Sequence, residues 1–125
     1  MADLASDFKD ALKTIEQEKT PDAVLKFFGD DAKLTRLNGE SYEGEDGAKQ
    51  FWDEYLETFE SQKTTFNHTT EGGGAVVLEW TSKGKLPNDK DFEYRGVSIL
   101  EGEGEKVSSF RTYYDSAVFV SEGGL

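Results

Sequence analysis

The 125-residue sequence contains no cysteine and a single histidine, His68. The absence of cysteine excludes disulfide bonds, thiolate metal sites and a cysteine nucleophile, and it fits the cytoplasmic location that we expect. One histidine without any cysteine also argues against a zinc site. No Lys-Ser/Thr pair of a phosphate-binding loop follows the Gly72–Gly74 run, and the acidic segments lack the calcium-loop pattern. We therefore expect no metal and no cofactor.

Long apolar runs and basic residues are also scarce. No apolar run approaches the ~20 residues needed to span a bilayer, and the N-terminus lacks the basic and apolar segments of a signal peptide. Fourteen Lys and Arg oppose 26 Asp and Glu, for a formal charge of -12. Nucleic acids and anionic membranes bind basic surfaces, so we expect neither as a partner. The length is typical of one domain, which we expect to span residues 1–125.

The sequence is rich in aromatic residues, with nine Phe, five Tyr and two Trp, and its N-terminal half shows helical periodicity. Apolar positions at helical spacing predict a helix over residues 3–18. Pro21 is typical of a helix start, and predicts a short second helix that continues through Phe28 and ends at Gly29. An aromatic stripe predicts a third helix over Ala48–Phe59.

The remaining segments are typical of strands and turns. A short strand is predicted over Lys33–Leu37, and Tyr42–Gly47 is interpreted as a loop. Four longer strands, separated by turns rich in Gly, Pro and Asn, are predicted over Lys63–Glu71, Ala75–Leu86, Asp91–Leu100 and Lys106–Phe119. Helices segregated from an antiparallel meander indicate an α+β fold.

Alternation along these strands separates two faces of the expected sheet. One face is mostly apolar and should receive the helices. It includes two sets of alternating residues, Leu78, Trp80 and Ser82 on one strand and Phe110, Thr112 and Tyr114 on another. The opposite face mixes tyrosines with charges. Because an amphipathic, aromatic-bearing face on a small domain is often a dimer interface, we expect a homodimer through the sheet face.

Three segments, taken in order, resemble a known family. They are Phe27-Phe28-Gly29-Asp30-Asp31-Ala32, then Tyr42–Gly47 leading into a helix, and the closing hairpin Gly96–Asp115 with its Tyr-Tyr-Asp-x-x-x-Phe ending. The layout resembles the nuclear transport factor 2-like superfamily, and within it the SnoaL-like polyketide cyclase family. The resemblance covers essentially the whole chain. It implies a cone-shaped roll of three helices packed on a curved antiparallel sheet, with an apolar pocket and dimers packed through the sheets.

The catalytic groups of two enzyme types with this fold are missing from the matching positions. Where ketosteroid isomerase relatives have their oxyanion-holding and proton-moving groups, this sequence has Phe8, Val97 and Arg36. Where the limonene-epoxide hydrolase type has its Arg and two Asp, this sequence has Trp80, Ser82 and Thr112. Polyketide cyclases use a pocket Asp with His support, and we place no such Asp here. The resemblance therefore carries the fold but not these chemistries.

Two arginines are candidate ligand-binding residues. The position that matches Arg36 faces the pocket in both enzyme families, so Arg36 is either a bidentate clamp for a ligand carboxylate or a structural ion-pair partner. Arg95 is two residues before Val97 and therefore lies on the same face of the predicted strand. It either flanks the same cavity or lies at an exposed strand end.

The other candidates are His68 and a set of wall residues. If His68 shares a face with Phe66, it can enter the cavity and act as a general base; otherwise it is a polar strand residue in contact with solvent. The ligand-binding candidates in the pocket wall are either wall or plain core: Trp52, Tyr55, Trp80, Ser82, Val97, Phe110, Thr112 and Tyr114.

Three functional hypotheses remain open. The first is a SnoaL-like domain that binds a small apolar molecule, with or without a carboxylate, in its cone. The second is a cofactor-independent isomerase, cyclase or dehydratase that uses His68 with Arg36 as electrostatic stabiliser. The third is a non-catalytic dimerising scaffold module whose functional surface is the sheet face.

Overall fold

The computed structural model describes residues 4–103 and 106–116, which fold as three helices and a six-stranded sheet. The helices are α1 (Leu4–Glu18), α2 (Asp22–Leu25) and α3 (Gly44–Glu57). The strands are β1 (Phe28–Thr35), β2 (Ser41–Glu43), β3 (Ser61–Gly72), β4 (Ala75–Lys85), β5 (Asp91–Glu103) and β6 (Lys106–Tyr114). The expected α+β class is confirmed.

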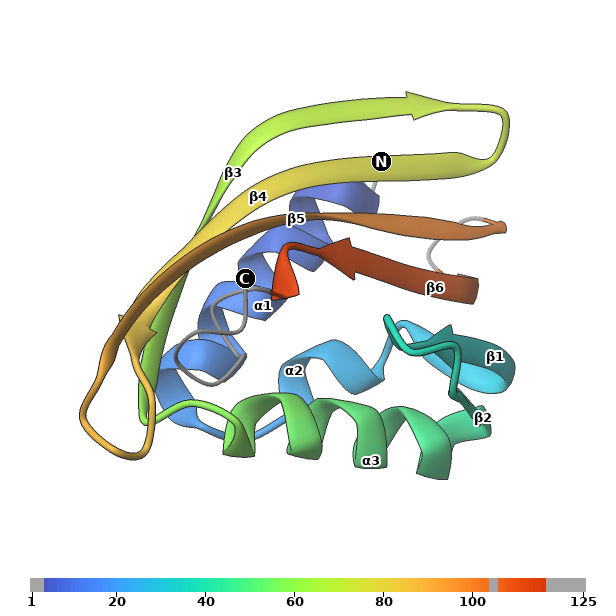
Figure 1. The fold of residues 1–125 in the computed structure, drawn as a ribbon. Coiled ribbons are helices and arrows are strands. Elements are labelled where there is room, and N and C mark those ends of the chain that lie inside the picture. The colour runs from blue at the N-terminus through green and yellow to red at the C-terminus, as the bar shows by residue number, and fades with distance from the viewer. Residues whose placement is uncertain (1–3, 104–105, 117–125) are drawn as a thin grey trace.

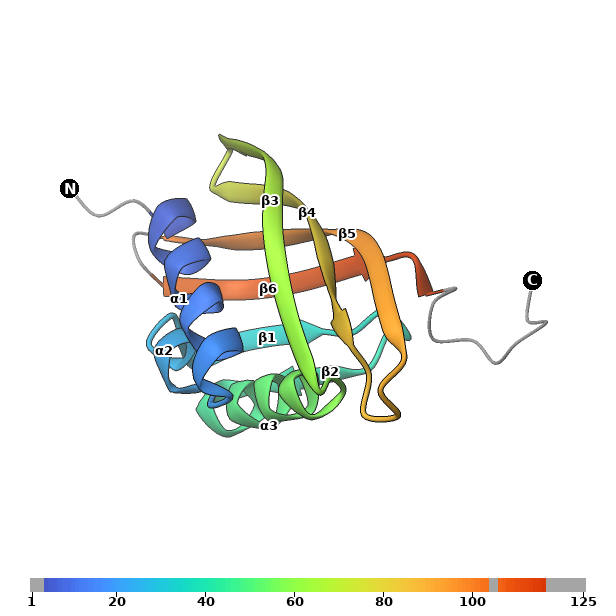
Figure 2. The ribbon, with the colours of Figure 1, turned by 90° about the vertical axis from the view of Figure 1, so that its left-hand side faces the viewer.

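The sheet has the order β2-β1-β6-β5-β4-β3 and is curved. Strands β3 to β6 form the expected antiparallel meander, whereas β1 pairs with β6 in parallel. Figure 1 shows the long strands β3, β4 and β5 bending over α1 and α3, and Figure 2 shows both helices on the concave side of the sheet. This arrangement is the cone that the resemblance implies. No helix in the described part of the chain is long and apolar enough to cross a membrane.

The second predicted helix is too long, because strand pairing takes over its last residues. The Val107 N–H donates to the Phe27 carbonyl at 2.8 Å, and Phe28 pairs with Val107 at the start of β1. Residues Phe28 and Gly29 therefore belong to a strand, and β1 begins earlier than the predicted Lys33.

The segment from Tyr42 onward was wrongly interpreted as a loop. Tyr42 pairs with Leu34 in the short strand β2, and α3 begins at Gly44, whose φ of 74° favours glycine. The closing strand ends at Tyr114, and the predicted continuation to Phe119 lies outside the described residues from residue 117 onward.

The core lies between the concave face of the sheet and the helices. Phe110 of β6 is 2% exposed, and its ring lies 5.9 Å from that of Phe8 of α1 and 5.3 Å from that of Trp52 of α3. A second aromatic cluster continues toward the far end of the sheet and contains Phe59, Trp80, Phe92 and Tyr94. The two clusters flank the space in which the candidate site lies.

Candidate functional site

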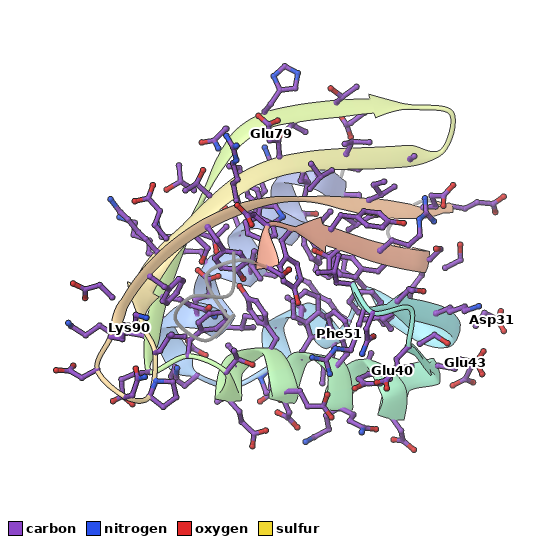
Figure 3. All side chains as sticks on the ribbon, viewed as in Figure 1. Asp31, Glu40, Glu43, Phe51, Glu79 and Lys90 are labelled. Carbon is purple, nitrogen blue, oxygen red and sulfur yellow. The ribbon has the colours of Figure 1, made fainter. Side chains whose placement is uncertain are left out.

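A cavity of about 350 Å³ opens between the concave face of the sheet and the helices. Ten of its nineteen described lining residues are aromatic: Phe8, Phe51, Trp52, Tyr55, Phe59, Phe66, Trp80, Tyr94, Phe110 and Tyr114. In Figure 3, Phe51 lies on the side of α3 that faces the sheet, whereas Glu79 lies on the outer side of β4. The volume is at the lower end of the range for small-molecule pockets and suits a compound of one or two rings.

Seven of the sequence-predicted residues line this cavity: Arg36, Trp52, Tyr55, Trp80, Phe110, Thr112 and Tyr114. Ser82 does not line it, but is fully buried, and its Oγ lies 3.2 Å from the Oγ1 of Thr64, which does. Alternation along β4 and β6 therefore predicts correctly which of their side chains face the cavity. Whether these side chains bind a ligand stays a prediction.

Arg95 and Val97 lie on the opposite face of the sheet, which corrects their expected position beside the cavity. Ser98 and Tyr94 of β5 line the cavity, so the alternating residues Arg95 and Val97 point outward. Val97 pairs with Glu79 on one side and with Tyr113 on the other. Arg95 is exposed, as in the alternative for this residue.

A β-bulge explains why His68 is also outside the cavity. Phe66 pairs with Trp80 and His68 with the next residue, Glu79, so Asn67 is an extra residue in β3. Alternation is interrupted there, and Asn67 and His68 are both exposed while Phe66 lines the cavity. The condition that His68 shares a face with Phe66 is therefore not met.

Arg36 lies at the rim of the cavity, where its side chain is 37% exposed. Its Nη1 donates to the Tyr42 hydroxyl at 3.0 Å and to Glu54 Oε1 at 2.7 Å, and the Tyr42 hydroxyl donates to the same carboxylate oxygen at 2.5 Å. The hydrogen bond from Tyr42 is the main cause that lowers the pKa of Glu54. An internal ion pair thus exists, yet it occupies one nitrogen, and Nη2 and Nε have no hydrogen-bond partner among the described residues.

A buried carboxylate behind the cavity wall was missed by the sequence analysis. Glu16 of α1 is 7% exposed and accepts three hydrogen bonds: from the Tyr55 hydroxyl at 2.7 Å, from the Thr64 backbone N–H at 3.0 Å and from the Thr64 hydroxyl at 2.6 Å. Its position four residues after buried Leu12 was a usable signal, because residues i and i+4 share a helix face. These donors satisfy a charge that burial would otherwise penalise.

A second group of side-chain hydrogen bonds crosses the strands in the cavity wall. Trp80 Nε1 donates to Ser98 Oγ at 3.0 Å, and Ser98 Oγ lies 3.2 Å from Thr112 Oγ1. Trp80, Ser98 and Thr112 come from β4, β5 and β6, so these contacts link three strands and hold the indole in place. The Trp52 N–H, by contrast, is buried and has no hydrogen-bond partner among the described residues.

Burial keeps two phenols of the wall protonated. Desolvation raises the pKa of Tyr55 well above its usual value, and it also raises the pKa of Tyr94. At neutral pH both hydroxyls are hydrogen-bonding groups and not bases. No cluster of metal-ligating side chains occurs within the described ranges.

Comparison with known proteins identifies the family. The model of the SnoaL-like domain family matches residues 9–110. The chain belongs to the SnoaL-like domain family. No curated protein matches its sequence.

Solved structures with the same fold share little sequence identity with this SnoaL-like domain. A nuclear transport factor 2-like protein from Anabaena variabilis has a TM-score of 0.82 at 20% identity, with 92% of this chain and 89% of that chain covered. A protein with a ketosteroid isomerase-like fold from Catenulispora acidiphila, solved with trimethylamine, has 0.79 at 18%, covering 95% and 93%. A putative SnoaL-like polyketide cyclase from Shewanella putrefaciens has 0.74 at 16%, covering 93% and 90%. At these identities the likeness shows the fold alone.

Proposed function

We propose that this SnoaL-like domain binds a small, largely apolar molecule in its cone cavity, and that Arg36 binds an acidic group of that molecule at the rim. The observation that carries the proposal is the combination of an open aromatic cavity with a rim arginine that, among the described residues, forms hydrogen bonds through Nη1 alone. Nη2 and Nε provide the donors for a ligand oxygen, and a guanidinium suits a carboxylate in particular.

The geometry supports binding over turnover by the residues first considered. A cofactor-independent isomerase, cyclase or dehydratase based on His68 needs that imidazole beside the substrate, and His68 is exposed on the outer side of β3. Tyr55 and Tyr94 are poor bases because burial raises the pKa of each phenol. The open cavity likewise favours a ligand over the scaffold hypothesis, since the bulky wall residues leave about 350 Å³ unfilled.

Thermal-shift measurements with two compounds of similar shape test the proposal. The compounds are 2-naphthoate and the uncharged 2-methylnaphthalene, and the proteins are the wild type, Arg36→Ala and the control Arg111→Ala. Arg111 is a matched control because it also pairs with a glutamate, Glu101, but lies on the outer face of the sheet.

We expect 2-naphthoate to stabilise the wild type and Arg111→Ala. At a hundred times its Kd the gain is about 2.7 kcal/mol, which shifts Tm by several degrees. Arg36→Ala should lose the shift with 2-naphthoate and keep any shift with 2-methylnaphthalene. Equal shifts by 2-naphthoate in all three proteins would rule out Arg36 as the anchor, and no shift by either compound in the wild type would argue against the cavity as a site for such molecules.

We also propose that two copies pair through the outer face of the sheet. Two rows of side chains run across its middle: Val77, Ile99 and Arg111 in one, and Glu79, Val97 and Tyr113 in the other. Tyr113 is 48% exposed, and the three aliphatic residues are only partly buried. An apolar, aromatic-bearing patch rimmed by charges has the composition of a protein interface.

A further inference from the structure

Glu16 holds the hydroxyls of Tyr55 and Thr64 in the cavity wall, and this determines which hydrogen-bonding groups of a ligand the wall can accept. A carboxylate oxygen can only accept, so both hydroxyls that contact Glu16 must donate to it. Tyr55 contributes one such hydroxyl, at 2.7 Å, and Thr64 the other, at 2.6 Å. Each hydroxyl has a single proton, and that proton is committed to Glu16.

Once its proton is committed, a hydroxyl oxygen offers only lone pairs to a ligand. Tyr55 and Thr64 both line the cavity. Tyr55 is only partly buried and lines the cavity, which indicates that its accessible part faces the cavity. Thr64 Oγ1 also lies near the Tyr55 oxygen and 3.2 Å from Ser82 Oγ. Because its one proton goes to the carboxylate at 2.6 Å, Thr64 Oγ1 can only accept from Ser82, and its second lone pair is left for a ligand.

The charge of Glu16 favours the same kind of ligand group, a hydrogen-bond donor. Glu16 makes no ion pair with any cation of the described residues, and its three hydrogen-bond partners are neutral. Its negative charge, transmitted through the polarised hydroxyls, favours a donor and disfavours another acceptor at this part of the wall. The rim has the opposite character, because Arg36 presents donors there.

We propose that the Tyr55 and Thr64 oxygens, held by Glu16, select ligands that carry a hydrogen-bond donor, namely a hydroxyl or amino group on an apolar, ring-bearing body. This inference rests on the proposed binding function of the cavity and specifies the class of ligand for the same site. Tyr55 and Thr64 contact the ligand, whereas Glu16 acts through them as a positioning residue.

The test compares 2-naphthol with 2-methylnaphthalene, which has a methyl group of similar size in place of the hydroxyl. Isothermal titration calorimetry gives a Kd for each compound with the wild type, Glu16→Gln and the control Glu18→Gln. Glu18 lies two residues further along α1 and is exposed. The quantity of interest is the ratio of the two Kd values, because it cancels changes in overall cavity shape.

We expect the wild type and Glu18→Gln to prefer 2-naphthol about tenfold, the effect of one good hydrogen bond. In Glu16→Gln the amide oxygen keeps the hydrogen bond from the Thr64 N–H, and the NH2 group takes the place of Oε2, which both hydroxyls contact. The NH2 group donates to the two hydroxyl oxygens and reverses their polarity, so the preference should fall below about threefold. Tyr55→Phe, which keeps the ring and removes the oxygen, should lower the same ratio and serves if Glu16→Gln does not fold.

The outcomes separate this inference from the proposed function. Binding of both compounds with equal affinity by the wild type would overturn the donor preference and leave the apolar site intact. The preference for 2-naphthol is expected to fall in Glu16→Gln, or in Tyr55→Phe if Glu16→Gln does not fold. An unchanged preference in the variant that is measured would overturn the proposed role of Glu16 and the two hydroxyls that it holds. No binding of either compound would overturn the proposed function, and the inference with it.

Discussion

The indole of Trp80 packs against the backbone of Gly96, its partner on the neighbouring strand. A Cβ atom added at Gly96 would lie 2.6 Å from Trp80 Cζ2 and 2.5 Å from the Tyr113 carbonyl oxygen. The absence of a side chain at Gly96 therefore lets the indole lie in the cavity wall and reach Ser98 with its N–H.

Gly96→Ala should destabilise the protein by about 1–3 kcal/mol, because a methyl group has no space beside the indole and a backbone carbonyl. The control is Gly29→Ala, also in a strand, where a Cβ would meet nothing within 4 Å. Denaturant titration should show a lower midpoint for Gly96→Ala and little change for Gly29→Ala. Wild-type stability in Gly96→Ala would mean that the indole moves aside without cost.

Alkaline pH should weaken the fold through Tyr55 and Tyr94. Burial raises the pKa of each phenol above the value of 10.0 for an unperturbed tyrosine. The contribution of each to stability is therefore complete below pH 10 and is lost as the pH rises above 10, because the unfolded state then releases a proton that the folded state retains. The loss is about 1.4 kcal/mol per pH unit for each phenol in that range.

Urea titrations at pH 8, 10 and 11 measure this slope. Tyr94→Phe should be less sensitive to the rise from pH 10 to 11 than the wild type. If Tyr94→Phe and the wild type lose stability in parallel, Tyr94 is not a source of the alkaline sensitivity.

The two faces of the sheet were largely predictable from the sequence, and the irregular positions were not. Regular alternation placed Trp80, Phe110 and Tyr114 on the cavity side. His68 could not be placed in the same way, because nothing in the polar run around Asn67 marks the bulge that shifts the register by one residue. A one-residue shift moves every following side chain to the other face.

Glu16 illustrates a different limit of sequence reasoning. A charged residue on an amphipathic helix is normally assigned to the polar face, and the donors that satisfy Glu16 come from positions 39 and 48 residues away. Only the packing of α1 against α3 and β3 shows that Tyr55 and Thr64 meet it. The internal pairing of Arg36 with Glu54 depends in the same way on tertiary contacts.

A charge on the outer face of the sheet should prevent the proposed dimer. Light scattering of the wild type at micromolar concentration should give about twice the chain mass of 14.0 kDa. Val97→Lys, in the row that contains Tyr113, should give the mass of one chain, because it replaces apolar surface in the middle of the patch with a charge that association would have to remove from water. Glu57→Gln, exposed on α3, makes the same change in net charge elsewhere and should remain a dimer. A monomeric wild type would refute the proposal.

Removal of Glu54 should strengthen the binding of an acidic ligand at Arg36. Glu54 occupies Nη1 of that guanidinium and places a negative charge beside the rim. Because both side chains are more than a third exposed, the pair contributes little to stability, and Glu54→Ala should cost less than about 1 kcal/mol. With its competitor absent, Arg36 should bind 2-naphthoate about threefold to tenfold more tightly, a gain of roughly 0.7–1.4 kcal/mol.

Calorimetric Kd values for 2-naphthoate and 2-methylnaphthalene check this expectation. The matched control is Asp53→Ala, which removes the neighbouring acid of α3 that pairs with Lys49. Glu54→Ala should change the Kd of 2-naphthoate alone, and Asp53→Ala should change neither Kd. Weaker binding of 2-naphthoate by Glu54→Ala would instead mean that the carboxylate of Glu54 orients Arg36 for the ligand, so that the ion pair would assist binding and not compete with it.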